Sequence, residues 1–214
     1  MFRQLPLRAF CLCIGISGFV WGTDSSPRVE QPAYAQKLKL PGLKDIGKIN
    51  DHLYRGAQPG EKGLKQLREK LDIDTIVDLR GEAKFILLKR ERKHAEDLGM
   101  QVVSLPGNGW SPPNDKEIAE FFALMQQSPR KRVFIHCWLG GDRVGEFIAA
   151  YRIAFDGWTA DQAIREMHVF HFKSHWHPAM EKYVRTFPER LAQSPTLAPY
   201  RHPEVAASAN NVAH

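Results

Sequence analysis

The sequence predicts an α/β fold, with a central, mostly parallel sheet of about four to five strands flanked by helices. Short apolar runs alternate along the chain with amphipathic helical patterns, which is typical of layered α/β domains. A glycine-rich loop joins one apolar run directly to a helix. The chain has 214 residues, of which 43% are hydrophobic and 25% charged, so it can fill one domain and short tails.

The first half of the domain contains two strand–helix pairs. Residues 53–55 form a short predicted strand, and residues 61–71 place their leucines on one helical face. Residues 74–80 are predicted as a buried strand because apolar, β-branched residues dominate them. Residues 84–98 form a charged amphipathic helix that ends at Gly99, a natural C-cap.

The second half repeats this alternation. Residues 101–105 are a predicted strand, and residues 114–127 a helix that Asn114 and Glu117 open as a capping box. Residues 132–136 are the strand that enters the glycine loop. Further helices are expected at 142–155, after Thr159, and at 180–191, the last with a break or bend at Pro188.

Composition divides the chain into four parts. Residues 1–23 have a basic start and then an apolar run too short for a comfortable membrane span, so we expect a signal peptide or an N-terminal anchor. Residues 24–48 read as a linker or arm, 49–192 as the domain and 193–214 as a disordered tail. The expected location is periplasmic or secreted, with membrane attachment only if the first segment stays uncleaved.

Charge and cysteine content narrow the function. The net charge is +6 and the basic residues are scattered, so anionic ligands are favoured and nucleic acid is not an expected partner. We expect a monomer. Two of the three cysteines, Cys11 and Cys13, lie in the N-terminal apolar segment. Cleavage there would leave Cys137 as the mature chain's single thiol, which favours a reactive nucleophile over a disulfide.

The segment that carries chemistry is 136–145, His-Cys-Trp-Leu-Gly-Gly-Asp-Arg-Val-Gly. A strand, a tight glycine loop and a helix N-terminus direct backbone N–H groups at one point, and such a nest binds a phosphate-sized anion. The same positive field favours the thiolate of Cys137. Arg143 adds a planar fork for two phosphate oxygens. The segment therefore predicts a nucleophile and an oxyanion clamp on one tetrahedral anion.

Residues 136–143 resemble the H-C-x5-R signature of cysteine-dependent protein tyrosine phosphatases, in their bacterial dual-specificity-like branch. The resemblance extends over about 49–190, and its supporting pieces are Tyr54–Pro59, Asp78–Arg80, Pro112–Pro113, Ala150–Arg152, and Ala163 with Glu166–Met167. It implies a cysteine-phosphatase-like fold and a phosphomonoester hydrolase that acts on phosphotyrosine peptides or other phosphomonoesters. No cofactor and no metal are implied.

The resemblance also implies residue roles. Cys137 would be the nucleophile and Arg143 the phosphate clamp, while His136 would hold the loop. The remaining substrate-binding candidates line the loop or its rim, and they are Trp138, Leu139, Gly140, Gly141, Val144, Gly145 and Trp110.

Two departures from the family pattern stand out. Val144 occupies a position where the family usually has Ser or Thr, whose hydroxyl assists the departing cysteine. The family's usual acid loop, here 107–113, contains no carboxylate. One candidate general acid is Asp142, because myotubularin-like relatives with a similar loop have an aspartate at this position that is their proposed acid. Asp115 is the other candidate, and the third alternative is that neither residue serves.

Two other functions stay open on sequence grounds. A rhodanese-type sulfurtransferase also uses one cysteine in an anion-cradling loop. The missing loop acid and Val144 also fit a catalytically weak phosphate-binding module. The closely spaced histidines His168, His171 and His175 are interleaved with aromatic residues, and no carboxylate or cysteine lies among them, so we expect no metal site there.

Overall fold

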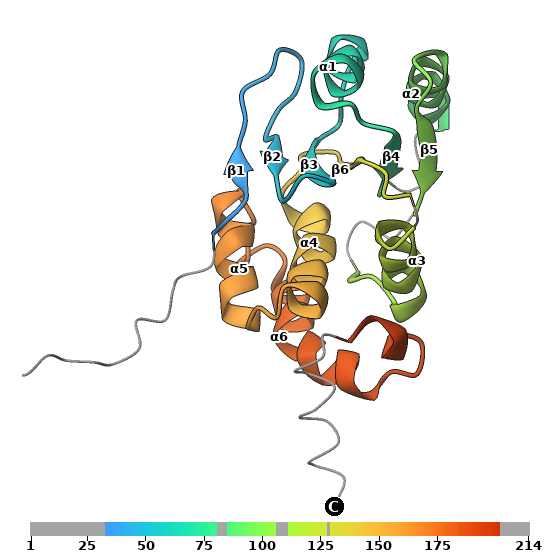
Figure 1. Cartoon of the computed structure of the whole chain (residues 1–214). Helices are drawn as coiled ribbons and strands as arrows, with labels where there is room; N and C mark the ends of the chain where they lie inside the picture. Colours follow the sequence, from blue (N-terminus) through green and yellow to red (C-terminus); the bar gives the residue numbers. More distant parts are fainter. Residues whose placement is uncertain (1–32, 81–84, 106–110, 128, 202–214) are drawn as a thin grey trace, which may run out of the picture. The chain divides into compact units, whose positions relative to one another are not determined.

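A six-stranded mixed sheet organises the computed structural model, which describes residues 33–80, 85–105, 111–127 and 129–201 (Figure 1). Its strand order is β1-β2-β3-β6-β4-β5. The strands are β1 Gln36–Lys37, β2 Gly47–Lys48, β3 Leu53–Ala57, β4 Thr75–Asp78, β5 Gln101–Ser104 and β6 Val133–Cys137. The α/β class and the parallel core of the sheet are as predicted, because strands β3, β6, β4 and β5 run parallel.

The central strand β6 brings the functional segment to the sheet's carboxyl edge. Ala57 at the end of β3 pairs with Cys137, and Asp78 at the end of β4 pairs with His136. In parallel α/β sheets, ligands bind at this edge. Three strand ends therefore meet around the cysteine.

The arm expected at 24–48 is, in its described part, built into the sheet. Strands β1 and β2 pair antiparallel with each other and β2 with β3, which adds strands beyond the number expected. Leu43 and Ile46 are buried, and the Ala35 N–H donates to Glu166 at 2.7 Å. The Ser, Pro, Gly and Lys content of this segment predicts a linker, but its apolar residues recur every two or three positions and pack into the domain.

The helices follow the predicted pattern closely. They are α1 Glu61–Leu71, α2 Phe85–Asp97, α3 Asp115–Met125, α4 Asp142–Phe155, α5 Ala160–Val169 and α6 Pro178–Gln193. Both predicted capping boxes are present, at Asn114 and at Thr159. Helix α6 is not broken at Pro188, and the other outcome expected there, a bend, stays a prediction. Its buried face, which includes Val184, Phe187 and Leu191, offsets the lost backbone hydrogen bond.

Helices cover both faces of the sheet. In Figure 1, α1 and α2 lie on one side, and α3, α4, α5 and α6 on the other. Alternate strand residues divide accordingly: Ile76 and Phe134 belong to the core under α1 and α2, whereas Val77 and Ile135 belong to the larger core under the other helices. Helix α4, which follows the functional loop, is buried along most of its length.

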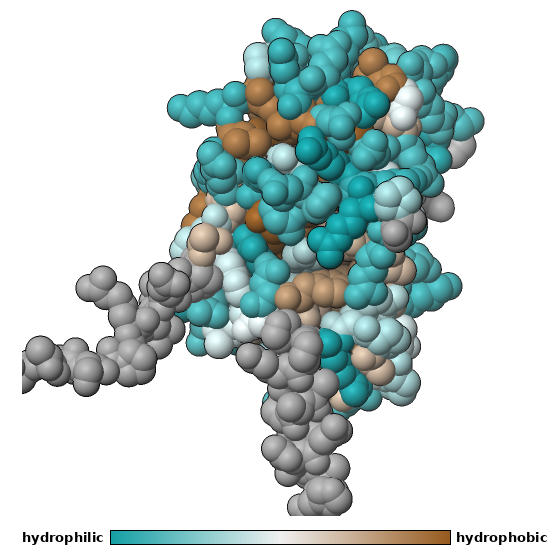
Figure 2. All heavy atoms as spheres, viewed as in Figure 1, coloured by the Kyte–Doolittle hydropathy of each residue, from teal (hydrophilic) through white to brown (hydrophobic). Residues whose placement is uncertain are grey.

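The surface view adds one feature of the smaller core. Figure 2 shows hydrophilic side chains over most of the viewed face, with hydrophobic ones near the β1–β2 hairpin and α1. Leu38 and Leu40 of the hairpin pack, partly buried, against this core. The hairpin therefore completes the α1 side of the domain.

The C-terminal segment begins in contact with the domain. Residues 194–201 belong to the part expected to be a disordered tail, yet Leu197 is fully buried and Tyr200 stacks edge-on against Phe122, with ring centroids 5.4 Å apart. A short 3-10 helix covers Ala198–Tyr200. The Pro, Ala and Asn content of this segment predicts disorder and gives no weight to these two apolar residues. None of the helices in the described part of the chain is both long and apolar enough to cross a membrane.

A buried ion pair joins the β1 segment, α4 and α5. Arg152 donates to both carboxylate oxygens of Glu166, at 3.1 and 2.8 Å, and also to Asp156 at 2.7 Å. We expect Glu166→Ala to lower the free energy of unfolding by about 3 kcal/mol, because the buried guanidinium loses the carboxylate that accepts two of its hydrogen bonds and the Ala35 N–H loses its acceptor. Asp156→Ala, whose carboxylate is more exposed, should cost about 1 kcal/mol or less. Urea unfolding measures both, and equal losses would contradict this ranking.

Candidate active site

The loop after β6 curls around the thiol of Cys137. Cys137 is the last residue of β6 and is only 6% exposed. The Gly140 N–H donates to its Sγ at 3.3 Å, and α4 begins two residues later. Gly140 has φ +83°, and a Cβ there would lie 2.5 Å from the Gly56 backbone. Only glycine therefore fits the turn that directs this N–H at the sulfur.

Arg55 on β3 stabilises this turn through hydrogen bonds to its backbone. Its Nη2 donates to the carbonyl oxygens of Gly140 at 2.6 Å and Gly141 at 3.3 Å. The side chain is fully buried, with its guanidinium 4.1 Å from the Phe170 ring centroid, and burial lowers the pKa of Arg55 to about 10. Arg55 is therefore charged at neutral pH. It turns the loop carbonyls away from the thiol and adds positive charge near it.

A second buried network supports the strand end. His136 Nε2 lies 3.0 Å from Glu91 Oε1 of α2, and His136 Nδ1 lies 3.3 Å from the Cys137 carbonyl oxygen. Arg80 approaches Glu91 at 2.9 Å and donates to both oxygens of Asp78. The two contacts of Glu91 have ion-pair distances without aligned hydrogen-bond geometry. The network connects α2 and β4 to the residue before the cysteine.

This network is also the one cluster, within the described ranges, whose donor atoms have metal-ligand spacing: Asp78, Glu91 and His136 offer atoms within 4.8 Å of one another. Arg80 already pairs with both carboxylates. A divalent cation would have to displace a fully buried guanidinium, so these residues do not fit a metal.

The outer part of the loop is open to solvent. Trp138 is 39% and Leu139 72% exposed, and the Arg80 guanidinium lies 5.3 Å from the Trp138 ring centroid. The Trp138 carbonyl accepts the Gln58 N–H at 3.3 Å, which ties the loop to the β3–α1 turn. The other tryptophan among the predicted substrate-binding residues, Trp110, lies outside the described residues.

The first turn of α4 carries the predicted clamp. Arg143 is its second residue, and Val144 and Gly145 behind it are buried. Gly145 faces the Met167 side chain of α5, which a Cβ would approach to 3.0 Å. Burial lowers the pKa of Arg143, while the charges of Cys137, Glu146 and, more weakly, Glu117 oppose that shift. Arg143 therefore lies within the electrostatic reach of the thiol.

Both candidate acids have structural partners. Asp142 accepts the Lys173 N–H at 3.2 Å and lies 3.8 Å from His177 Nε2, so it ties α4 to the α5–α6 connection. Asp115 accepts a hydrogen bond from Arg190 of α6 at 2.8 Å. Each contact would restrain the carboxylate during proton transfer, and the general acid stays a prediction.

Sequence reasoning missed Glu146. It lies on α4 among buried apolar residues and is itself 0% exposed. Burial raises its pKa to about 9, with Arg143 opposing. A lone carboxylate within an apolar helical stretch was the signal available in the sequence.

The comparisons with known proteins decide the family. The family model described as DSP-PTPase phosphatase fused to NAD+ kinase matches residues 44–185. The chain belongs to this DSP-PTPase phosphatase family. Membership confirms the resemblance drawn from residues 136–143, and it favours a phosphatase over a rhodanese-type sulfurtransferase.

Individual relatives agree. The dual specificity protein phosphatase TpbA of Pseudomonas aeruginosa (strain UCBPP-PA14) is 29% identical over 144 residues, which cover 67% of this chain and 60% of that protein. The chain thus spans about three fifths of this curated relative. Human phosphatidylglycerophosphatase and protein-tyrosine phosphatase 1 is 22% identical over 164 residues, covering 74% of this chain and 82% of that protein.

Solved structures show the same fold. The crystal structure of P. aeruginosa TpbA is 27% identical, with a TM-score of 0.59 over 72% of this chain and 90% of that one. A TpbA variant in complex with pTyr is 24% identical, with a TM-score of 0.62 over 77% of this chain and 99% of that one.

The close approach at Gly140 yields a prediction. We expect Gly140→Ala to displace the loop, because the new Cβ would meet the Gly56 backbone and the residue would keep a left-handed φ. Affinity for inorganic phosphate, measured by calorimetry, should fall at least about tenfold. Gly60→Ala, where a Cβ meets nothing within 4 Å, is the matched control and should bind normally. Unchanged affinity in the Gly140 variant would refute the required turn.

Proposed function

We propose that this protein hydrolyses phosphomonoesters through a cysteinyl-phosphate intermediate. The observation that carries the proposal is the hydrogen bond from the Gly140 N–H to Cys137 Sγ, at the start of the helix that bears Arg143. A donor aimed at the sulfur from a helix N-terminus stabilises a thiolate and would also hold a phosphate oxygen.

The first step forms the intermediate. The Cys137 thiolate attacks phosphorus in line with the ester bond, an S–P bond forms, and the P–O bond to the leaving group breaks. The leaving oxygen takes a proton from a carboxylic acid, for which Asp142 and Asp115 are the proposed candidates. Loop N–H groups and Arg143 stabilise the charge on the transferring group.

The second step returns the enzyme to its starting state. A water attacks phosphorus, the S–P bond breaks, and the electron pair returns to Cys137 as thiolate. One proton of the water passes to the carboxylate that gave its proton in the first step, and inorganic phosphate leaves. Val144 offers the departing sulfur no hydroxyl, so we infer that this step limits the rate.

A phosphotyrosine peptide is the substrate class we favour, with a broader range of phosphomonoesters as the alternative. Trp138 and Leu139 are exposed on the loop and supply an apolar rim for an aromatic ring. The pTyr complex of the TpbA variant supports this choice. Trp110 remains a proposed further wall.

Export is the proposed setting of this activity. The basic and apolar layout of residues 1–23 supports a signal peptide, with a periplasmic or secreted mature protein that acts as a monomer. An uncleaved segment would instead anchor the protein to a membrane. Fractionation of the expressed full chain, with N-terminal sequencing, distinguishes the two.

Removal of the nucleophile tests the main proposal. We expect Cys137→Ser to lower phosphate release from an aryl phosphate and from a phosphotyrosine peptide by roughly a thousandfold or more. Phosphate binding and the melting temperature should be preserved, since Ser is smaller and uncharged. Full turnover by this variant would overturn the mechanism. The substitution Glu69→Ala, at an exposed position of α1 outside the proposed site, should leave turnover of the aryl phosphate nearly intact.

The residue after Arg143 gives a second test. We expect Val144→Thr to speed the second step on the order of tenfold, because a hydrogen bond to the departing thiolate is worth about 1.5 kcal/mol or more. Val144 is fully buried, and Thr has nearly its shape. Rapid-quench measurement should show less phospho-enzyme in the steady state. Val144→Ala, which adds no hydroxyl, is the control, and an equal gain in both variants would contradict the hydroxyl's role.

A further inference from the structure

Glu146 is a buried acid for which the proposed mechanism has no use. It lies three residues after Arg143 on α4, so both side chains lie on one side of the helix. It is 0% exposed, and neither carboxylate oxygen has a hydrogen-bond partner within the described residues. The Tyr183 hydroxyl of α6 is likewise buried without one. Buried polar groups are rarely left so, and such exceptions call for a functional reason.

The surroundings of Glu146 keep it neutral. Burial is the main cause that raises its pKa, and the charges of Asp142 on α4 and Glu117 on α3 add to it. Arg143 is the cation that opposes them. Helix α6 contributes Tyr183, whose own pKa is raised by burial and by the charge of Glu146. Helix α5 faces this turn with Met167.

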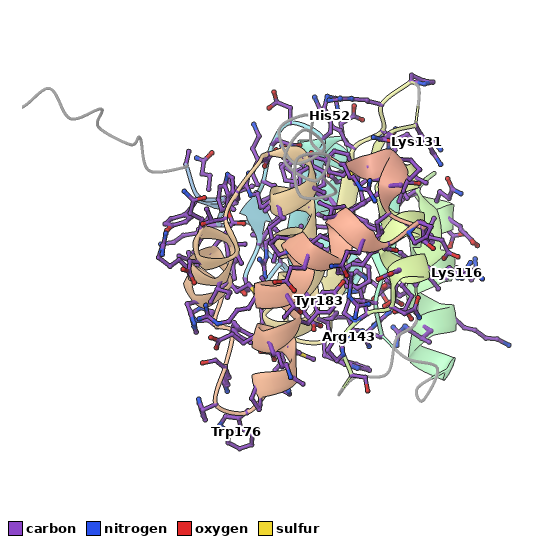
Figure 3. All side chains as sticks on the ribbon, turned by 90° about the horizontal axis from the view of Figure 1, so that it is seen from below. His52, Lys116, Lys131, Arg143, Trp176 and Tyr183 are labelled. Atoms are coloured by element: carbon purple, nitrogen blue, oxygen red, sulfur yellow. The ribbon has the colours of Figure 1, made fainter. Side chains whose placement is uncertain are left out.

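Arg143 is the group through which Glu146 can act. The charges of Cys137 and Glu146 are the two strongest that Arg143 experiences. Figure 3 shows Arg143 and Tyr183 in the same central region, whereas Trp176 projects at the edge. A carboxylate one helical turn after the guanidinium, in a medium of low dielectric, would pair with the charge that the substrate's phosphate needs.

We propose that Glu146 is a positioning residue: with its proton in place it leaves the charge of Arg143 to the phosphate, and when it loses the proton it takes that charge and weakens phosphate binding. The inference rests on the proposed function, because it assumes that Arg143 holds phosphate. The proton lost goes to solvent, and phosphate binding favours its return by the same factor, as linkage requires.

Calorimetry with inorganic phosphate tests the proposal. The parent for this experiment is Cys137→Ser, since Ser carries no negative charge beside the bound phosphate. Between about pH 8 and about pH 10 phosphate stays a dianion, so its own charge is constant. With a pKa of about 9, only about a tenth of Glu146 keeps its proton at about pH 10. The parent's affinity should therefore fall about tenfold across the range.

Two matched variants separate Glu146 from other titrating groups. Glu146→Gln, with nearly the same shape and no charge to gain, should lose no more than about twofold in affinity by about pH 10, where Arg55, with its pKa of about 10, is half deprotonated. Glu120→Gln, on the exposed side of α3, should lose affinity as the parent does. An identical decline in the Glu146 variant and the parent would overturn the inference. Failure of the parent to bind phosphate at about pH 8 would instead overturn the phosphate cradle of the proposed function.

A third measurement keeps Glu146 in place, so that it can test the inference even if the Glu146→Gln variant misfolds. Carbon NMR of the Glu146 carboxyl in the parent should show a titration near pH 9 that moves upward when phosphate saturates the protein. A titration that stays in place would overturn the coupling. In the active protein, the KM for an aryl phosphate should rise over the same range while kcat changes less, and a fall in kcat alone would contradict a role in binding.

Discussion

The hydrogen bonds from Arg55 to the loop after β6 are the interaction on which the candidate site depends. A loop whose N–H groups converge on one point must turn its carbonyl oxygens elsewhere, and Arg55 donates hydrogen bonds to two of those oxygens, on Gly140 and Gly141. The guanidinium is fully buried and stacks on Phe170. Removing it would take the shorter of its two bonds from the Gly140 carbonyl in a buried environment, whereas the Gly141 carbonyl would keep the Gly145 N–H as a donor. The Gly140 N–H could then no longer be held toward the thiol.

Buried charges recur around this loop, and each one joins elements that are distant in the chain. Glu91 of α2 connects to His136, and Arg152 of α4 connects to Glu166 of α5. Such pairs contribute little net stability, because desolvation opposes their attraction, but a missing partner is costly. Glu146 is the exception, since burial raises its pKa to about 9 and it follows Arg143 by one helical turn. The buried ion pairs therefore restrict the domain to one arrangement of its elements rather than making the fold more stable.

Most elements of the fold could be predicted because their signals are local. Helix α1 shows its leucines at helical spacing, and α3 and α5 begin with capping boxes. The predictions of a linker over 33–48 and of disorder at the start of the tail are wrong. Single apolar residues there, such as Ile46 and Leu197, are buried only by partners that lie far away in the sequence. The continuous α6 has the same explanation: burial of its apolar face, which no local pattern reveals, outweighs the effect of Pro188.

The sequence alone determined the chemistry of the site, since Cys137, Gly140 and Arg143 lie within seven consecutive residues and need only a strand, a turn and a helix to converge. It also determined the family. Tertiary structure decided what surrounds them: Arg55 beneath the loop, Glu91 behind His136, and a protonated Glu146 near Arg143. Those contacts join residues far apart in the chain, or depend on burial that three other helices create. Sequence spacing reveals neither the long-range contacts nor the burial, because packing and desolvation arise only when the layers assemble.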